Sequence, residues 1–172
     1  MIVLVTYNHE LRQTLCSFLR ERGYGVSIPE HREDALPLVQ QLHPKVIVLD
    51  MYNTEPNGLT FLKQLRASGY SGKVIVLNGN SNRMMTPGIL QQKVDKIICH
   101  IPSQNPAPLM DQIEHSIRSL FREEIENRAF EKFLSRGKRT GEDLADWIEA
   151  EAEILNSQLK ETKTQDCSSG RI

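Results

Sequence analysis

Four polar residues each follow directly after a short, strongly apolar run of the chain. They are Thr6 after Ile2–Val5, Asp50 after Val46–Leu49, Asn78 after Val74–Leu77 and His100 after Ile97–Cys99. Asp50 is the carboxylate of this set, and a carboxylate held in a crevice is a marker of functional sites, although structural ion pairs share that property. Asp50 therefore has two interpretations: a functional carboxylate, or a strand-end residue that accepts hydrogen bonds from loop amides.

The other side chains capable of chemistry are scattered along the chain. Cys16, Cys99 and Cys167 form no C-x-x-C pair, and their odd number argues against a disulfide framework or a cysteine zinc site. No histidine cluster that could ligate a metal is present, since the remaining histidines are isolated at His9, His31, His43 and His115. Because no glycine-rich phosphate loop or nucleophile elbow occurs either, the sequence does not favour an enzyme.

Strand-like and helix-like patterns alternate through the first two thirds of the chain. The four apolar runs, and a weaker one at Gly25–Ile28, are each too short for a helix and predict buried parallel strands. Between them, apolar residues recur at helical spacing, as at Leu11, Leu15 and Leu19. Five such units with right-handed crossovers predict an α/β fold, a doubly wound five-stranded parallel sheet of order 2-1-3-4-5. Ligands of these sheets bind at the carboxyl ends of the strands, where the four polar residues should meet.

Two of the predicted helices have unusual starts. With Asp34 as N-cap, Pro37 falls in the first helical turn, where its missing N–H is harmless. Thr86 and Pro87 similarly predict an N-cap and first helical residue, which leaves about two turns before Val94 for the fourth helix.

The alternating elements lie in four segments, IVLVTYNHELRQTLCSFLRERGYGV, VIVLDMYNTEPNGLTFLKQLR, KVIVLNGN and VDKIICHIP. Together they resemble the receiver domain of bacterial response regulators over about residues 1–120. Receivers end their third strand in a phosphoacceptor aspartate with a glycine eight residues later, and Asp50 and Gly58 keep that spacing. The resemblance implies a flavodoxin-like sheet, two-component signal transduction and a phosphorelay in which Asp50 accepts the phosphoryl group.

The same resemblance implies further residues that this chain replaces. Receivers hold magnesium with an acidic pair after the first strand, where Thr6 and Tyr7 stand here. Their switch serine or threonine corresponds to Asn78, their phosphate-binding lysine to His100, and the aromatic residue that follows the switch to Ile97. Magnesium binds proteins through one or two carboxylates, so this degenerate active site should bind it poorly. No metal or other cofactor is expected unless Asp50 is a genuine phosphoacceptor.

The family geometry also places His100 beside Asp50. A partly buried carboxylate would then favour the imidazolium form of His100 and make the crevice sensitive to pH. A solvent-exposed strand-end His100 is the alternative. Tyr7 and Tyr52 fall on loops that flank the crevice and could fill the position of the magnesium ion.

The charges of the chain nearly cancel. It has 172 residues, 21 Lys and Arg against 22 Asp and Glu, and a formal net charge of -1, so its global charge indicates neither a nucleic-acid nor a membrane partner. By segment, residues 118–139 carry 7 basic and 4 acidic side chains, whereas residues 140–161 carry 1 and 7. This polarity predicts two helices side by side or a charge-matched partner. The opening MIVLV and the absence of a long apolar run predict a cytoplasmic protein.

The C-terminal third predicts a helical hairpin. Apolar residues keep helical spacing from residue 109 to 134 with no Gly or Pro before Gly137, which predicts one continuous helix of about 27 residues. A capping box at Thr140–Asp143 predicts the start of a second helix. We expect a receiver-like domain over residues 1–120, the hairpin over residues 121–159 and a flexible tail over residues 160–172.

The hairpin itself is similar to a small bacterial helical family of unknown function, over about residues 121–157. The similarity lies in Arg128-Ala129-Phe130, Arg136-Gly137 and the run DWIEAEAE that begins at Asp146. Two helices of this length cannot bury all of their apolar residues alone, so the receiver, a second copy or another protein must cover them. The candidate interaction residues are Phe130, Phe133, Trp147, Ile148 and Leu155. A homodimer through this region is the simplest closed solution.

These observations favour a non-enzymatic signalling module. The leading hypothesis is a degenerate receiver that acts through protein–protein interaction and is not phosphorylated by the usual magnesium-dependent route. The alternative is a genuine response regulator with Asp50 as the phosphoacceptor. The expected partner is a protein, either a histidine kinase or another signalling protein. The acidic second helix of the hairpin would repel a phosphate backbone, so no nucleic acid is expected.

Overall fold

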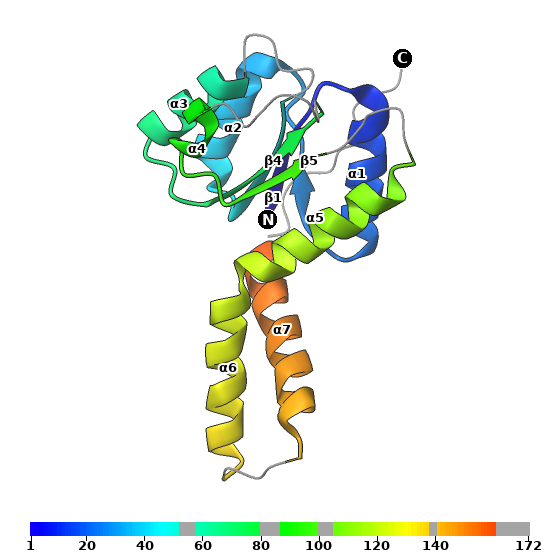
Figure 1. The fold of residues 1–172 in the computed structure, drawn as a ribbon, viewed down its shortest axis with the longest axis vertical. Helices are drawn as coiled ribbons and strands as arrows, with labels where there is room; N and C mark the ends of the chain where they lie inside the picture. The colour runs from blue at the N-terminus through cyan, green and yellow to red at the C-terminus, as the bar shows by residue number, and fades with distance from the viewer. Residues whose placement is uncertain (52–57, 80–86, 100–104, 138–140, 161–172) are drawn as a thin grey trace.

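The computed structural model describes residues 1–51, 58–79, 87–99, 105–137 and 141–160. Within these ranges the chain forms a sheet and seven helices (Figure 1). No helix there is long and apolar enough to cross a membrane. The elements are β1 (Ile2–Val5), α1 (His9–Glu21), β2 (Val26–Ser27), a short 3-10 turn (Arg32–Asp34), α2 (Ala35–Leu42), β3 (Val46–Asp50), α3 (Gly58–Ala67), β4 (Lys73–Asn78), α4 (Pro87–Leu90), β5 (Lys96–Cys99), α5 (Ala107–Leu120), α6 (Arg122–Ser135) and α7 (Asp143–Leu159).

The strands form one parallel sheet in the order β2-β1-β3-β4-β5, which confirms the predicted doubly wound fold. β1 and β3 are neighbours, with Ile2 opposite Val46 and Val5 opposite Leu49. Every residue of both strands is buried, as expected for central strands of a sheet that is covered on both faces. The weak apolar run near residue 26 forms the short edge strand β2.

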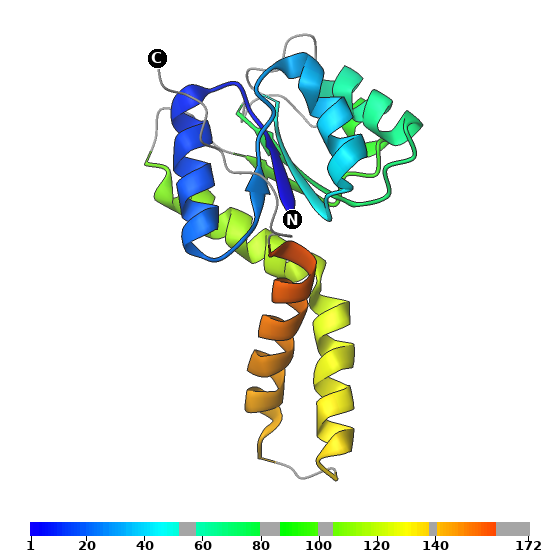
Figure 2. The same cartoon turned by 180° about the vertical axis from the view of Figure 1, so that it is seen from behind.

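Helices cover the two faces of the sheet (Figures 1 and 2). Successive side chains of a strand point to opposite faces. Accordingly Ile2 and Leu4 of β1 lie in one hydrophobic cluster with residues of α1 and α5. Val3 and Val5 lie in the other, with residues of α2, α3 and α4.

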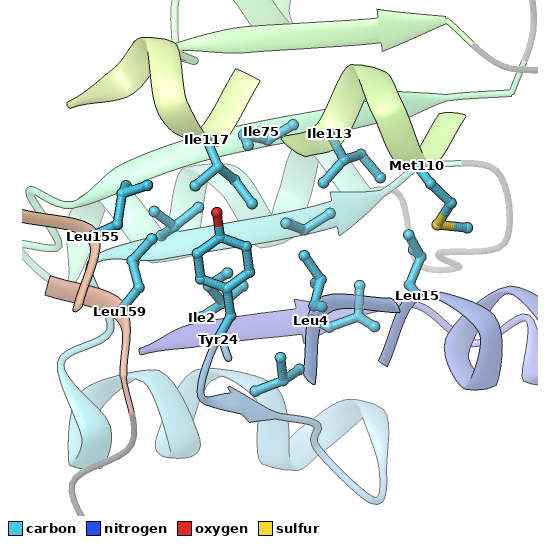
Figure 3. Close-up of a cluster of buried hydrophobic side chains, with 14 of the residues drawn as sticks. Ile2, Leu4, Leu15, Tyr24, Ile75, Met110, Ile113, Ile117, Leu155 and Leu159 are labelled. Carbon is cyan, nitrogen blue, oxygen red and sulfur yellow. The ribbon is translucent and has the colours of Figure 1, made fainter. Parts of the chain in front are cut away.

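The base of the C-terminal hairpin belongs to the first of these clusters. Figure 3 shows Tyr24 at its centre, with Ile117 of α5 on one side and Leu155 and Leu159 of α7 beside it. The N–H of Gly25 donates to the carbonyl of Leu159 at 2.7 Å, next to the start of β2. The receiver-like part therefore covers the base of the hairpin, where α7 ends, and the two share one core.

The prediction of one continuous helix from residue 109 to 135 is wrong, because the chain turns at Phe121. There the α-helical hydrogen bonding tightens, with the N–H of Phe121 donating to the carbonyl of Arg118 at 3.2 Å. α6 then leaves α5 and projects away from the sheet with α7 (Figure 1). Phe121 and Ile125 are 3% and 1% exposed, so the turn buries both in the shared core. A straight helix would carry Ile125 away from it.

The predicted helix starts are partly confirmed. α2 begins at Ala35 after Asp34, which places Pro37 in the first turn, and α4 begins at Pro87. α4 has a single turn rather than two. α7 begins at Asp143 with Glu142 as N-cap, so the predicted capping box from Thr140 is wrong in register. Thr140 itself lies outside the described residues.

Ion pairs join α6 to α7 along one side of the hairpin. Arg128 donates to Glu153 at 2.7 Å, and Lys132 lies 2.7 Å from Glu153 and 3.2 Å from Glu149. Nearer the tip, Arg136 pairs with Glu142 and with the buried Asp146. The basic and acidic segments therefore neutralise each other within the chain, as two helices side by side.

Two carboxylates, Glu114 on α5 and Glu153 on α7, link the stability of the fold to pH. Hydrogen bonds from Lys132 and Arg128 lower the pKa of Glu153 from its usual 4.5. Burial would raise the pKa of Glu114, but hydrogen bonds from Arg22 and Arg118 outweigh it and lower that pKa as well. A carboxylate whose pKa is lower in the folded state contributes stability above pH 4.5, and this contribution is lost as the pH falls through the folded value.

We therefore expect the free energy of unfolding to fall progressively as the pH drops below 4.5. The protein's single tryptophan, Trp147, lies on α7, so urea unfolding followed by tryptophan fluorescence reports on the hairpin. A Glu153→Gln variant is expected to show a weaker pH dependence than the wild type. Identical curves for both proteins between pH 7 and pH 3 would contradict this assignment.

Candidate functional site

The sheet places Thr6 directly beside Asp50. Thr6 follows the last residue of β1, and Asp50 is the last residue of β3. Because these parallel strands are neighbours with Val5 opposite Leu49, the next residue of each lies at the same level of the carboxyl edge. Both side chains are buried, with 2% of Thr6 and 1% of Asp50 exposed.

A hydrogen bond connects the two side chains. The Thr6 hydroxyl donates to Asp50 Oδ2 at 2.8 Å, and the same hydroxyl oxygen accepts the N–H of Asn8 at 3.3 Å. Asn8 in turn caps α1, since its Oδ1 accepts the N–H of Leu11 at 3.1 Å. The start of α1, Thr6 and Asp50 thus form one connected polar group in which the hydroxyl proton is directed at the carboxylate.

The side chain at position 6 is a weaker ligand for magnesium than a carboxylate. The Thr6 hydroxyl is uncharged and donates its proton to Asp50, which fills one lone-pair site of that carboxylate. Magnesium requires nearly octahedral oxygen ligands and is usually held by one or two carboxylates together with phosphate oxygens. Within the described residues, no group of three or more His, Cys, Asp or Glu side chains could hold a metal ion.

The other crevice residues are placed in part. Asn78 ends β4, is half-buried and stands opposite Cys99 of β5. Tyr7 is half-buried and packs against the cluster formed with α2, α3 and α4. His100 and Tyr52 lie outside the described residues, so the hypotheses of an Asp50–His100 pair and of tyrosines at the magnesium position stay predictions.

Comparison with known protein families shows which family the chain belongs to. The family model for the response regulator receiver domain matches residues 2–101. The chain belongs to this family. A second model, for a protein family of unknown function called DUF2934, matches residues 121–156, which form most of the hairpin. Both predicted resemblances are therefore confirmed.

Individual relatives agree with this assignment. The transcriptional regulatory protein BaeR of Escherichia coli is 32% identical over 65 residues, which are 38% of this chain and 27% of BaeR. The response regulator MprA of Mycolicibacterium vanbaalenii is 28% identical over 81 residues, 47% of this chain and 35% of MprA. The matches therefore span only about a quarter to a third of these curated relatives.

Solved structures share the fold. The chemotaxis response regulator CheY4 of Vibrio cholerae superposes with a TM-score of 0.57 at 18% identity, covering 67% of this chain and 96% of CheY4. The N-terminal domain of an uncharacterised protein from Wolinella succinogenes gives 0.57 at 21% identity, covering 72% and 98%. The CheY4 match therefore leaves about a third of this chain without a counterpart.

The predicted interaction residues of the hairpin separate into three environments. Phe130 and Ile148 are 59% and 57% exposed, whereas Phe133 and Trp147 are half-buried. The Phe130 and Phe133 rings are stacked with centroids 6.3 Å apart. Leu155 is buried in the chain's own core, so it is not available to a partner. Its proposed role as an interaction residue is therefore corrected.

The hydrogen bond from Thr6 to Asp50 was not predicted from the sequence, where Thr6 counted only as a lost magnesium ligand. The signal was nevertheless present. A sheet of order 2-1-3 makes the first and third strands neighbours, and a threonine after one strand then meets an aspartate at the end of the other.

Removing the hydroxyl should destabilise the fold. Thr6→Val keeps the shape of the side chain but leaves Asp50 Oδ2 and the Asn8 N–H without this partner, which is expected to cost about 1–3 kcal/mol of unfolding free energy. Thr6→Ser, the control, retains the donor and should lose less. Urea unfolding at neutral pH measures both variants, and an equal stability of the valine and serine variants would exclude a structural contribution from the hydroxyl.

Proposed function

We propose that this chain is a degenerate receiver that acts as a non-enzymatic signalling and protein-interaction module. The supporting observation is the buried hydrogen bond from Thr6 to Asp50, at the position where the family holds an acidic pair. Phosphoryl transfer needs a divalent metal and cationic groups to neutralise the transferred group. Because Thr6 donates a neutral hydroxyl to Asp50, position 6 supplies no second carboxylate for that metal ion.

The proposal includes where and with what the module works. We infer a cytoplasmic protein whose receiver part spans residues 1–120, whose hairpin spans residues 121–159 and whose tail spans residues 160–172. Its partner is a protein, such as a histidine kinase or another signalling protein. Because the basic residues along α6 are ion-paired to carboxylates of the same chain, they do not support binding to nucleic acid. The proposal also includes a homodimer formed through the hairpin.

A genuine phosphorelay response regulator is the second candidate. It is favoured by Asp50 at the end of β3 with Gly58 at the start of α3, the spacing that the family uses. In that case Asp50 would attack the phosphoryl group of a donor, and its hydrogen bond with Thr6 would have to break. The two candidates therefore differ in whether Asp50 can be modified at all.

Direct phosphorylation separates these candidates. Incubation of the full chain with a small phosphodonor and magnesium, followed by intact-mass measurement, is expected to leave the wild type unmodified. Asp50→Asn serves as the matched negative control, and a receiver with an intact acidic pair as the positive control. A phosphorylated wild type together with an unmodified Asp50→Asn variant would establish the phosphorelay function instead.

A second experiment restores one acidic residue. Thr6→Asp places a carboxylate beside the buried Asp50, and two like charges in such a site repel each other unless a cation lies between them. The melting temperature of this variant should therefore fall in the presence of a chelator and recover with millimolar magnesium, because ligand binding stabilises the folded state. The wild-type melting temperature should not respond to magnesium. A magnesium-dependent increase in the wild type would show that its crevice already binds the ion.

A further inference from the structure

Different interactions join the two helices at the two ends of the hairpin. At the base, both helices contribute to the hydrophobic core that they share with the receiver, through Ile125, Ala150, Leu155 and Leu159. We call residues 130–137 and 141–149 the distal segment, which lies at the end of the hairpin away from the sheet (Figure 1). Among these residues, all of which the structure describes, only Asp146 is buried, with 3% of its side chain exposed. The distal segment therefore encloses a charged group where the base encloses apolar ones.

Ion pairs join α6 to α7 in the distal segment. Two cations from the α6 side each contact two carboxylates from the α7 side. The pairs are Lys132 with Glu149 at 3.2 Å and with Glu153 at 2.7 Å, and Arg136 with Glu142 and with Asp146. We call these six residues the ionic seam. The Lys132 side chain is 14% exposed, so this ammonium group is also largely removed from water.

The ionic seam uses residues of the motifs that the hairpin shares with the family of unknown function. The model for that family matches residues 121–156. Four of the six seam residues lie in the shared motifs, namely Arg136, Asp146, Glu149 and Glu153. Each of them contacts a side chain of the opposite helix in the same hairpin. In this chain the charged residues of the motifs therefore serve to join the two helices.

Ion pairs hold two helices less firmly than apolar burial does. Taking charges out of water is costly, and their mutual attraction offsets this cost only when the geometry is favourable. Pairs that remain in contact with water, such as Arg136 with the exposed Glu142, are weak and are screened by salt. The distal aromatic residues Phe133 and Trp147 are only half-buried. A region with so little apolar burial can open locally without unfolding of the whole protein.

We propose that the ionic seam is a latch, and that the distal segment opens and closes on it while the base of the hairpin and the receiver stay folded. With the latch closed, the hairpin follows its base as one piece. Once apart, the distal parts of α6 and α7 are too short to be stable helices in water, so opening also breaks their backbone hydrogen bonds. This inference goes beyond the proposed function and does not depend on whether Asp50 can be phosphorylated.

Hydrogen–deuterium exchange of the full chain, followed by peptide mass spectrometry, tests the latch. After correction for intrinsic rates, amides of residues 131–135 and 147–149 in the wild type should exchange at least about tenfold faster than those of residues 125–129 and 154–158. Raising the NaCl concentration from about 0.1 M to about 1 M should increase this ratio, because the Debye length falls from about 10 Å to about 3 Å. The apolar contacts of the base give no such response.

Removing one charge of the seam should release the latch. Asp146→Asn keeps the size of the side chain but removes the buried charge that pairs with Arg136, and it should speed distal exchange by about tenfold or more. The matched control is Glu151→Gln on the same helix. It breaks a 3.1 Å ion pair with Arg118 at the base, where apolar burial attaches α7, and it should leave distal exchange unchanged.

An apolar replacement tests the latch in the opposite direction. The double variant Arg136→Met/Asp146→Leu removes this ion pair and places apolar side chains at the same positions, an exchange that buried ion pairs often tolerate or that even stabilises the fold. Its distal amides should exchange more slowly than those of the wild type and should respond less to salt. If Asp146→Asn fails to fold, the double variant and the salt response of the wild type decide the question.

Several results would overturn the latch. Equal exchange of distal and basal amides in the wild type would show that the hairpin opens as one unit, as would an Asp146→Asn variant in which both sets speed up together. Distal exchange that responds neither to salt nor to Asp146→Asn would be ordinary fraying of helix ends. A double variant whose distal amides do not slow would show that the ionic seam is not the weak part of the hairpin.

Discussion

The hydrophobic cluster around Tyr24 is the interaction on which the arrangement of the chain depends. It joins β1, α1 and α5 to the last turns of α7, where Leu159 is completely buried and Leu155 nearly so. Burying a leucine side chain is worth about 1.5–3 kcal/mol, whereas an exposed ion pair contributes at most about 1 kcal/mol. The exposed pair of Arg118 with Glu151 therefore orients the hairpin, but apolar burial attaches it.

The arrangement around Asp50 also depends on the sheet, because the pairing of β1 with β3 brings Thr6 beside it. In the family pattern, several carboxylates at the carboxyl edge require a cation, because like charges at short range cannot all ionise without one. In this chain Thr6 provides a proton donor where a carboxylate would stand, and Asp50 is satisfied inside the protein. Under the proposed function, Thr6 and Tyr7 in place of the family's acidic pair make a site that does not need the ion.

The sequence predicted those features that depend on local periodicity. The sheet order, the positions of the central strands and the two helices of the hairpin follow from short apolar runs that alternate with helical spacing. The turn at Phe121 could not be predicted in this way, since neither Gly nor Pro marks it and its cause is the burial of Phe121 and Ile125 against distant residues. The burial of Leu155 was missed for the same reason. Within the site, the sequence placed Thr6 and Asp50 at the ends of two strands, but the hydrogen bond between them required the pairing of those strands to be considered together.

Both helices of the hairpin are attached to the receiver part at the base, which determines how the hairpin can move. α6 continues from α5 through the buried Phe121, and the end of α7 returns to the sheet at Gly25. An arm on a single linker would swing freely, but one anchored twice must follow its base as a rigid lever. α6 has 14 residues and is therefore about 21 Å long, so a 10° rotation of the base would displace the hairpin tip by about 4 Å. A small rearrangement of α5 against the sheet would in this way be magnified along the hairpin, whose base contacts the chain at the starts of β1 and β2, whereas Asp50 is the last residue of β3.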